Sequence, residues 1–262
     1  MSLAFWRWVI SFVLLSPFIL VSLKRHYADL RAHFPKLVML ALLSVTSFNS
    51  LLYLAAQSTT AINITLVNAT TPLITLLIAM PLIRYRPRLP ELLAIGIALT
   101  GALWLLSHGS LESLLALQSQ KGDLIMLTGV VTWSLYSVLL RRWSLPIPTF
   151  PLFCLLVLLG TPLIFPFYLW EYQHQGGFTL DWPILLALGY IGLFPSIAAY
   201  LLWNHGVRVV GPAQATVFSY LTPLLTACLA IPLLGESLHL YHLAGGLLIL
   251  IGLMLTNRFS RN

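Results

Sequence analysis

The sequence predicts an all-α polytopic membrane protein, and three observations lead to this fold class. The 262 residues are 59% hydrophobic and only 8% charged, with a mean hydropathy of +0.91. Soluble domains carry roughly 25% charged residues, which they need to cover their surface. The apolar residues form long runs separated by short polar breaks, and Lys and Arg gather in alternate breaks. An ordinary soluble domain and a disordered chain are therefore excluded.

Nine apolar runs are candidates for helices that cross a hydrocarbon core of about 30 Å, which takes about 20 helical residues. In order, the runs are 4–22, 37–57, 62–82, 91–107, 122–140, 147–169, 183–204, 212–233 and 242–256. The last run is short, so we expect its polar ends to reach the interface or the bilayer to thin locally. Internal prolines such as Pro72, Pro166 and Pro195 predict kinks, because neighbouring helices in a bundle can bind the freed carbonyl groups.

The distribution of Lys and Arg predicts how the nine helices are oriented. If alternate breaks share a side, twelve of the fourteen basic residues fall on one side, and Arg7 and Lys121 fall on the other. Cytoplasmic loops carry the excess of Lys and Arg, so we expect a cytoplasmic C-terminus and an N-terminus outside. The first run is not expected to be a signal peptide, because its basic pair, Lys24 and Arg25, follows the apolar residues.

The chain also matches itself at an offset of 151 residues. The matches are Thr71-Pro72-Leu73 with Thr222-Pro223-Leu224, Thr75 with Thr226, Ala79 with Ala230, Pro81-Leu82 with Pro232-Leu233, and Gly101 with Gly252. The break after Leu82 is basic, whereas its counterpart at 235–239 has no Lys or Arg. We therefore expect two repeats of inverted topology.

The expected division of the chain follows from this match. The first repeat takes 1–110 with four helices, and the second takes 122–257 with five. A periplasmic linker at 111–121 joins them, and a cytoplasmic tail at 258–262 follows. Because the first copy lacks a counterpart of the helix at 122–140, the pattern predicts a ten-helix fold without its first helix.

Polar and aromatic side chains inside the runs are the candidates for a substrate pathway, because polar groups in a bilayer are costly unless they line a pathway or pair with one another. The candidates are Asn49, Tyr53, Asn63, Asn68, Trp133, Tyr136, Tyr200, Trp203, Asn204, Gln214, Ser219 and Tyr220. Four pairs are repeat counterparts: Asn49 with Tyr200, Tyr53 with Asn204, Asn63 with Gln214, and Asn68 with Ser219. They predict an aromatic and amide-lined pocket for a small neutral, zwitterionic or lipophilic solute. The alternative is that they only bond between helices or form interfacial belts.

Arg7 is the only cation near the interior of a run, and it has two interpretations. Its side chain either snorkels to the outer surface or contacts an anionic group. No Asp or Glu lies in the middle of a run, so a carboxylate proton relay is not expected. His239 and His242 have no third ligand nearby in sequence, so we expect no metal, and no motif indicates a cofactor.

Several short motifs resemble the EamA-type transporters of the drug/metabolite transporter superfamily. The motifs are Ala4-Phe5-Trp6-Arg7, Asn68-Ala69-Thr70-Thr71-Pro72-Leu73, Tyr220-Leu221-Thr222-Pro223-Leu224, and Gly235-Glu236 followed by Gly245-Gly246 and Gly252. The resemblance implies a pathway between two inverted repeats, exchange between inward-open and outward-open states, and export of metabolites or toxic compounds. We expect a multi-pass protein of a bacterial inner membrane.

A secondary transporter is thus the expected function, and an accessory or structural subunit that needs a partner chain is the alternative. A membrane enzyme would need clustered His, Asp or Glu at a membrane face, and none is visible. The expected partners are a small-molecule substrate and the lipid bilayer. Nucleic acid is not expected, because the basic residues are scattered. Gly245-Gly246 and Gly252 permit close helix packing, either within one chain or in a homodimer.

Overall fold

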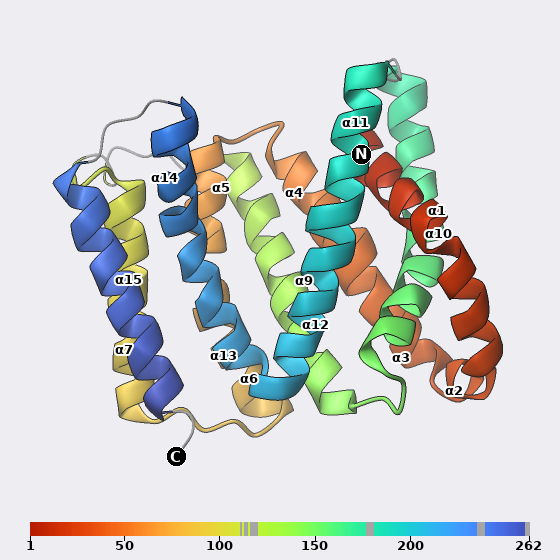
Figure 1. Ribbon diagram of the computed structural model, residues 1–262, viewed down its shortest axis with the longest axis horizontal. Coiled ribbons are helices and arrows are strands. Elements are labelled where there is room, and N and C mark those ends of the chain that lie inside the picture. The colour runs from red at the N-terminus through yellow and green to blue at the C-terminus, as the bar shows by residue number, and fades with distance from the viewer. Residues whose placement is uncertain (111, 113–114, 116–119, 177–180, 235–238, 260–262) are drawn as a thin grey trace.

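The computed structural model is a bundle of helices, and it describes residues 1–110, 112, 115, 120–176, 181–234 and 239–259 (Figure 1). No strand occurs in these residues. Eight helices of the described part are long and apolar enough to cross a membrane. The predicted fold class, an all-α polytopic membrane protein, is confirmed.

The helices follow the predicted runs closely. The first part of the chain forms α1 (Ser2–Arg25), α2 (Tyr27–Ala32), α3 (Phe34–Ala41), the π-helical η1 (Leu42–Phe48), α4 (Asn49–Ala55), α5 (Ala61–Asn68), α6 (Thr71–Leu82) and α7 (Leu89–Leu106). The second part forms α9 (Lys121–Trp143), α10 (Thr149–Gln175), α11 (Trp182–Ile191), the π-helical η2 (Gly192–Ala198), α12 (Ala199–Val210), α13 (Pro212–Val217), the 3-10 helix η3 (Phe218–Tyr220), α14 (Leu221–Leu234) and α15 (Leu240–Phe259).

The run at 212–233 is the one expected span that is not among the eight. It is helical, but α13, η3 and α14 divide it. The predicted linker at 111–121, the tail at 258–262 and the Gly235-Glu236 motif fall mostly or wholly outside the described residues.

Local sequence explains where several helices begin and end. The Asp181 carboxylate accepts a hydrogen bond from the Ile184 N–H at 3.0 Å and caps α11. The Asp123 carboxylate accepts one from the Gln120 N–H at 2.8 Å at the start of α9. Gly211 has a φ of +89°, which L residues rarely adopt, and it ends α12 directly before Pro212 starts α13.

The two π-helical segments lie at corresponding positions of two spans. η1 starts at residue 42 and η2 at residue 192, a separation of 150 that is close to the offset of 151 in the sequence. Pro195 has no N–H to continue the helix, and the Ser196 hydroxyl instead donates to the Ile191 carbonyl at 2.8 Å. Such bulges widen a helix and leave carbonyl groups free, which is why they often mark functional sites.

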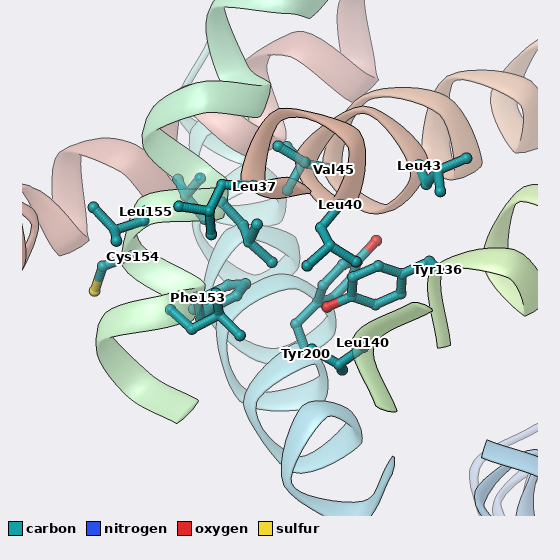
Figure 2. Packing of buried hydrophobic residues seen from close by; sticks show 14 of the residues in the cluster. Leu37, Leu40, Leu43, Val45, Tyr136, Leu140, Phe153, Cys154, Leu155 and Tyr200 are labelled. Atoms are coloured by element: carbon teal, nitrogen blue, oxygen red, sulfur yellow. The ribbon is translucent and has the colours of Figure 1, made fainter. Parts of the chain in front are cut away.

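Three clusters of buried hydrophobic side chains hold the bundle together, and the smallest contains Ala55, Met126 and Val130. One core contains buried residues of α1, α3, η1, α9, α10 and α12, and Figure 2 shows Leu37, Leu40, Phe153 and Tyr200 packed within it. A second core lies between α6, α7, α13 and α15. The first core contains Tyr136 and Tyr200 of the candidate site described below.

Helices α7 and α15 are in direct contact through small residues. A Cβ atom added to Gly101 would lie 2.7 Å from the Gly245 carbonyl oxygen, and one added to Gly252 would lie 2.7 Å from that of Ala94. The two contacts are related by the repeat offset of 151, because Gly101 corresponds to Gly252 and Ala94 corresponds to Gly245. The three glycines that suit either packing mode thus meet residues of the same chain: Gly245 and Gly252 lie against α7, and Gly246 lies against Leu224 of α14.

The connections lie at two ends of the bundle. Figure 1 shows the α6–α7, α9–α10 and α12–α13 connections at the lower end, together with the C-terminus and α2. These are the segments that carry most of the Lys and Arg residues. Which end faces the cytoplasm stays a prediction.

We expect Gly101→Ala to destabilise the protein by about 1–3 kcal/mol, because the added methyl group overpacks a backbone contact. Gly96 on the same helix is the matched control, since a Cβ there meets nothing within 4 Å. Thermal unfolding of the detergent-solubilised variants measures the difference. Equal melting temperatures for Gly101→Ala and Gly96→Ala would show that α7 and α15 do not pack as described.

Candidate functional site

An aromatic cluster lies where α9, η1 and α12 meet, and we define it as Phe48, Trp133, Tyr136, Tyr200 and Trp203. The Trp133 ring is its centre: ring centroids lie 4.8 Å away for Phe48, 5.1 Å for Tyr200, 5.2 Å for Trp203 and 5.4 Å for Tyr136. Figure 2 shows the Tyr136 and Tyr200 side chains within the packed layer. Four candidates from the sequence are therefore neighbours.

Amide groups border this cluster. The Tyr136 hydroxyl donates to Asn204 Oδ1 at 2.5 Å, and Asn49 Nδ2 donates to the Tyr200 hydroxyl at 2.6 Å. The Tyr200 hydroxyl donates in turn to the Ser44 carbonyl at 3.2 Å. Asn204 is fully buried, and its Nδ2 has no partner among the described residues. A buried amide N–H without a partner costs about 1–3 kcal/mol.

Arg7 is buried beside the cluster, with 6% of its surface exposed. Nε donates to Ser196 Oγ at 2.5 Å, Nη1 to Asn49 Oδ1 at 2.8 Å, and Nη2 to the Pro195 carbonyl at 2.8 Å. The side chain therefore does not snorkel to a surface. It connects α1 with α4 and with η2.

The charge of Arg7 has no carboxylate partner in the part of the chain that the structure describes. Three neutral oxygens solvate it, and these bonds use three of the five N–H groups of a guanidinium. An unpaired charge within a membrane span is costly and usually has a function. Two N–H groups remain that a bound anionic group can accept from.

Asn49 connects the cation with the aromatic cluster. Its Oδ1 accepts from Arg7 while its Nδ2 donates to Tyr200, so both ends of one amide are used. Tyr53 follows one helical turn later on α4, on the same side of the helix. The Asn49 side chain therefore links Arg7 directly to Tyr200 of the aromatic cluster.

The other sequence candidates lie elsewhere. Asn63 Nδ2 donates to the Asp123 carboxylate at 3.2 Å near the start of α9. Asn68 ends α5, where the helix breaks before α6, and its Oδ1 accepts from Thr71. Ser219 donates to the Thr216 carbonyl at 2.6 Å. Tyr220 belongs to the second core, and Gln214 lines a separate cavity.

Sequence reasoning missed several residues around the site. The Ser196 hydroxyl accepts from Arg7, and the Ser137 hydroxyl accepts from Trp203 Nε1 at 3.1 Å. Trp8 packs edge-on against Tyr200 with ring centroids 5.0 Å apart. Serines within apolar runs often bond only to their own helix, so nothing in the sequence distinguished these two. The one signal in the sequence that could have indicated Trp8 is its position directly after Arg7.

Comparisons with known proteins agree with this architecture. The chain is 23% identical over 253 residues to the "Uncharacterized transporter YyaM" of Bacillus subtilis (strain 168), covering 97% of this chain and 83% of the relative. It is 28% identical over 258 residues to an "Uncharacterized transporter" of Archaeoglobus fulgidus, covering 97% and 86%. It is 31% identical over 175 residues to the "Uncharacterized inner membrane transporter YedA" of Escherichia coli (strain K12), covering 65% and 53%.

Comparisons with solved structures and with family models identify a similar fold and the family. A solved crystal structure of a protein has a TM-score of 0.79 with this chain at 21% identity, covering 100% of this chain and 88% of that one. The model of the EamA-like transporter family matches residues 1–107 and 120–258. The chain, a multi-pass integral membrane protein, therefore belongs to the EamA-like transporter family.

Proposed function

We propose that the protein is a secondary transporter that exports small metabolites or drug-like solutes by alternating access between two inverted repeats. In this proposal the aromatic cluster, together with Arg7, Asn49 and Asn204, binds the solute. The observation that carries it is the hydrogen bond between Asn49 and Tyr200, because these residues are separated by the repeat offset of 151. A residue that touches its own repeat counterpart lies close to a two-fold axis, where transporters of this type bind solutes.

Two further observations support the two repeats at 1–110 and 122–257. The contacts between α7 and α15 exchange with each other under the same offset. The π-helical segments η1 and η2 also occur at corresponding places, and both contribute to the site. The helix contacts and the π-helical segments thus both favour the same repeat relationship between the two halves.

The groups that line the site favour a particular class of solute. Aromatic rings offer flat apolar surfaces, and Asn204 Nδ2 offers a buried donor. Arg7 offers two more N–H groups and a positive charge. This combination suits a neutral or zwitterionic solute with an apolar part and an acceptor such as a carbonyl or carboxylate.

The distribution of acidic residues favours facilitated exchange over proton coupling. The three described carboxylates that lie in spans and bond there, Glu91, Asp123 and Glu171, are near span ends. No described carboxylate bonds to Arg7 or to the aromatic cluster. A proton relay through a buried acid therefore has no support within the described residues.

The accessory-subunit alternative has less support. Two relatives that are named as transporters each match 97% of this chain, and the matches extend through both halves. The α15 glycines that would suit a homodimer contact α7 and α14 of the same chain. We place the protein in a bacterial inner membrane with a cytoplasmic C-terminus, as the positive-inside rule suggests.

We expect Asn49→Ala and Tyr200→Phe each to lower the initial transport rate by about tenfold or more, because a buried hydrogen bond to a charged network contributes about 1.5–3 kcal/mol. Efflux from proteoliposomes loaded with a metabolite panel measures this. Ser219→Ala is the control, since that hydroxyl bonds to its own helix. Unchanged efflux of every solute in both variants would contradict the site.

Arg7 is tested with two substitutions, because it could act on solute or only hold helices together. Arg7→Gln removes the charge, whereas Arg7→Lys keeps it, and both lose the geometry of three bonds. We expect Arg7→Lys to retain more transport of zwitterionic solutes than Arg7→Gln when rates are normalised to folded protein. Equal normalised rates would assign Arg7 a purely structural role.

The orientation is tested with reporter fusions. A green fluorescent protein joined after residue 262 should fluoresce, because it folds in the cytoplasm, whereas alkaline phosphatase at the same place should be inactive. Alkaline phosphatase joined after residue 115 should be active if 111–121 is periplasmic. The reverse pattern would invert the proposed topology.

A further inference from the structure

A cavity of about 510 Å³ lies at the end of the bundle that carries the basic connections. It is bordered by the end of α9, the segment after α6 and the turn between α12 and α13, which meet at the lower end in Figure 1. Its polar lining consists of Tyr85, Arg141, Arg142 and Gln214, with Gly211 and Pro212 at the turn. It is distinct from the aromatic cluster, and none of its lining residues belongs to that cluster.

Two arginines form one wall of the cavity. Arg141 Nη1 donates to the Arg208 carbonyl, which holds this guanidinium in place at the turn. Arg142 makes no hydrogen bond or ion pair with any residue that the structure describes. Both side chains are exposed, so each can meet a ligand without moving a helix.

The cavity has no acidic counterpart. None of its lining residues is Asp or Glu. The carboxylate of Glu91 is buried and accepts from the Tyr85 hydroxyl at 2.5 Å. Burial and this bond raise the pKa of Tyr85 above its ordinary value. No carboxylate among the described residues forms an ion pair with Arg141 or Arg142.

The positive-inside rule accounts for basic residues at this end of the bundle, but it makes no demand that they share a cavity. Here Arg141, Arg142 and Gln214 all line one space that has the volume of a ligand site. Guanidinium groups bind phosphate through paired N–H bonds, and basic pockets between helix ends lie at the depth of lipid headgroups.

We propose that this cavity binds a phosphate group through Arg141 and Arg142, with Gln214 as a further donor. The phosphate belongs either to the headgroup of an anionic lipid or to a soluble phosphate. The proposal does not depend on the proposed transport function, because it concerns a different site.

The test uses the purified full chain and two double variants of equal charge. Arg141→Gln with Arg142→Gln removes the wall of the cavity, and Lys24→Gln with Arg25→Gln removes two exposed charges at the end of α1. Native mass spectrometry and lipid titration measure binding of phosphatidylglycerol, with phosphatidylcholine, a zwitterion of zero net charge, as the comparison. A second titration uses inorganic phosphate and pyrophosphate without lipid. Melting temperatures verify that both variants are folded.

We expect the variant of Arg141 and Arg142 to bind about tenfold more weakly or worse, and the variant of Lys24 and Arg25 to bind within about twofold of the original chain. Binding of phosphatidylglycerol alone assigns the phosphate to a lipid, and binding of inorganic phosphate or pyrophosphate assigns it to a soluble ligand. Equal loss in both variants, no loss in the cavity variant, or no binding of any probe by the original chain would overturn the proposal.

Discussion

A buried cation, Arg7, with no carboxylate partner among the described residues is the constraint around which the centre of this bundle is arranged. Within a bilayer no water is available to solvate a charge, so the protein must supply the dipoles. Arg7 receives three of them, from Asn49, Ser196 and the Pro195 carbonyl. Because these partners come from two other spans, satisfying one side chain fixes three helices relative to one another. The aromatic cluster is built on the same residues, since Asn49 also holds Tyr200.

The unusual backbone of η2 supplies two of these dipoles, and that of η1 borders the aromatic cluster. A regular α-helix uses its own carbonyls and offers few acceptors to a neighbour. In η2 the proline interrupts the pattern, and its carbonyl and the next hydroxyl face Arg7. In η1, Phe48 belongs to the cluster, and the Ser44 carbonyl accepts from Tyr200. A chain that moves between two states needs such places, because a bulge allows a helix to change locally while its ends stay packed.

Much of this architecture could be predicted from the sequence, and the exceptions have physical causes. Hydropathy located the spans because their length is set by the bilayer, and the depth of Trp133, Tyr136, Tyr200 and Asn204 in their spans placed them near one another. Hydropathy could not predict η1, which contains neither Pro nor Gly. It also could not assign partners: Asn63 looked like a pathway residue by depth, but Asp123 on another helix occupies its amide. Pairings between helices depend on rotation about each helix axis, which a run of apolar residues leaves undetermined.

If the two halves work through the contact between Asn49 and Tyr200, a double-mutant cycle on transport reveals it. Initial efflux rates are compared for the original chain, Asn49→Ala, Tyr200→Phe and the variant with both changes, each normalised to folded protein. Residues that act through one hydrogen bond show non-additive losses. We expect the double variant to be about as slow as the slower single variant. A double variant whose losses multiply would show that the two side chains act independently, and it would contradict the account.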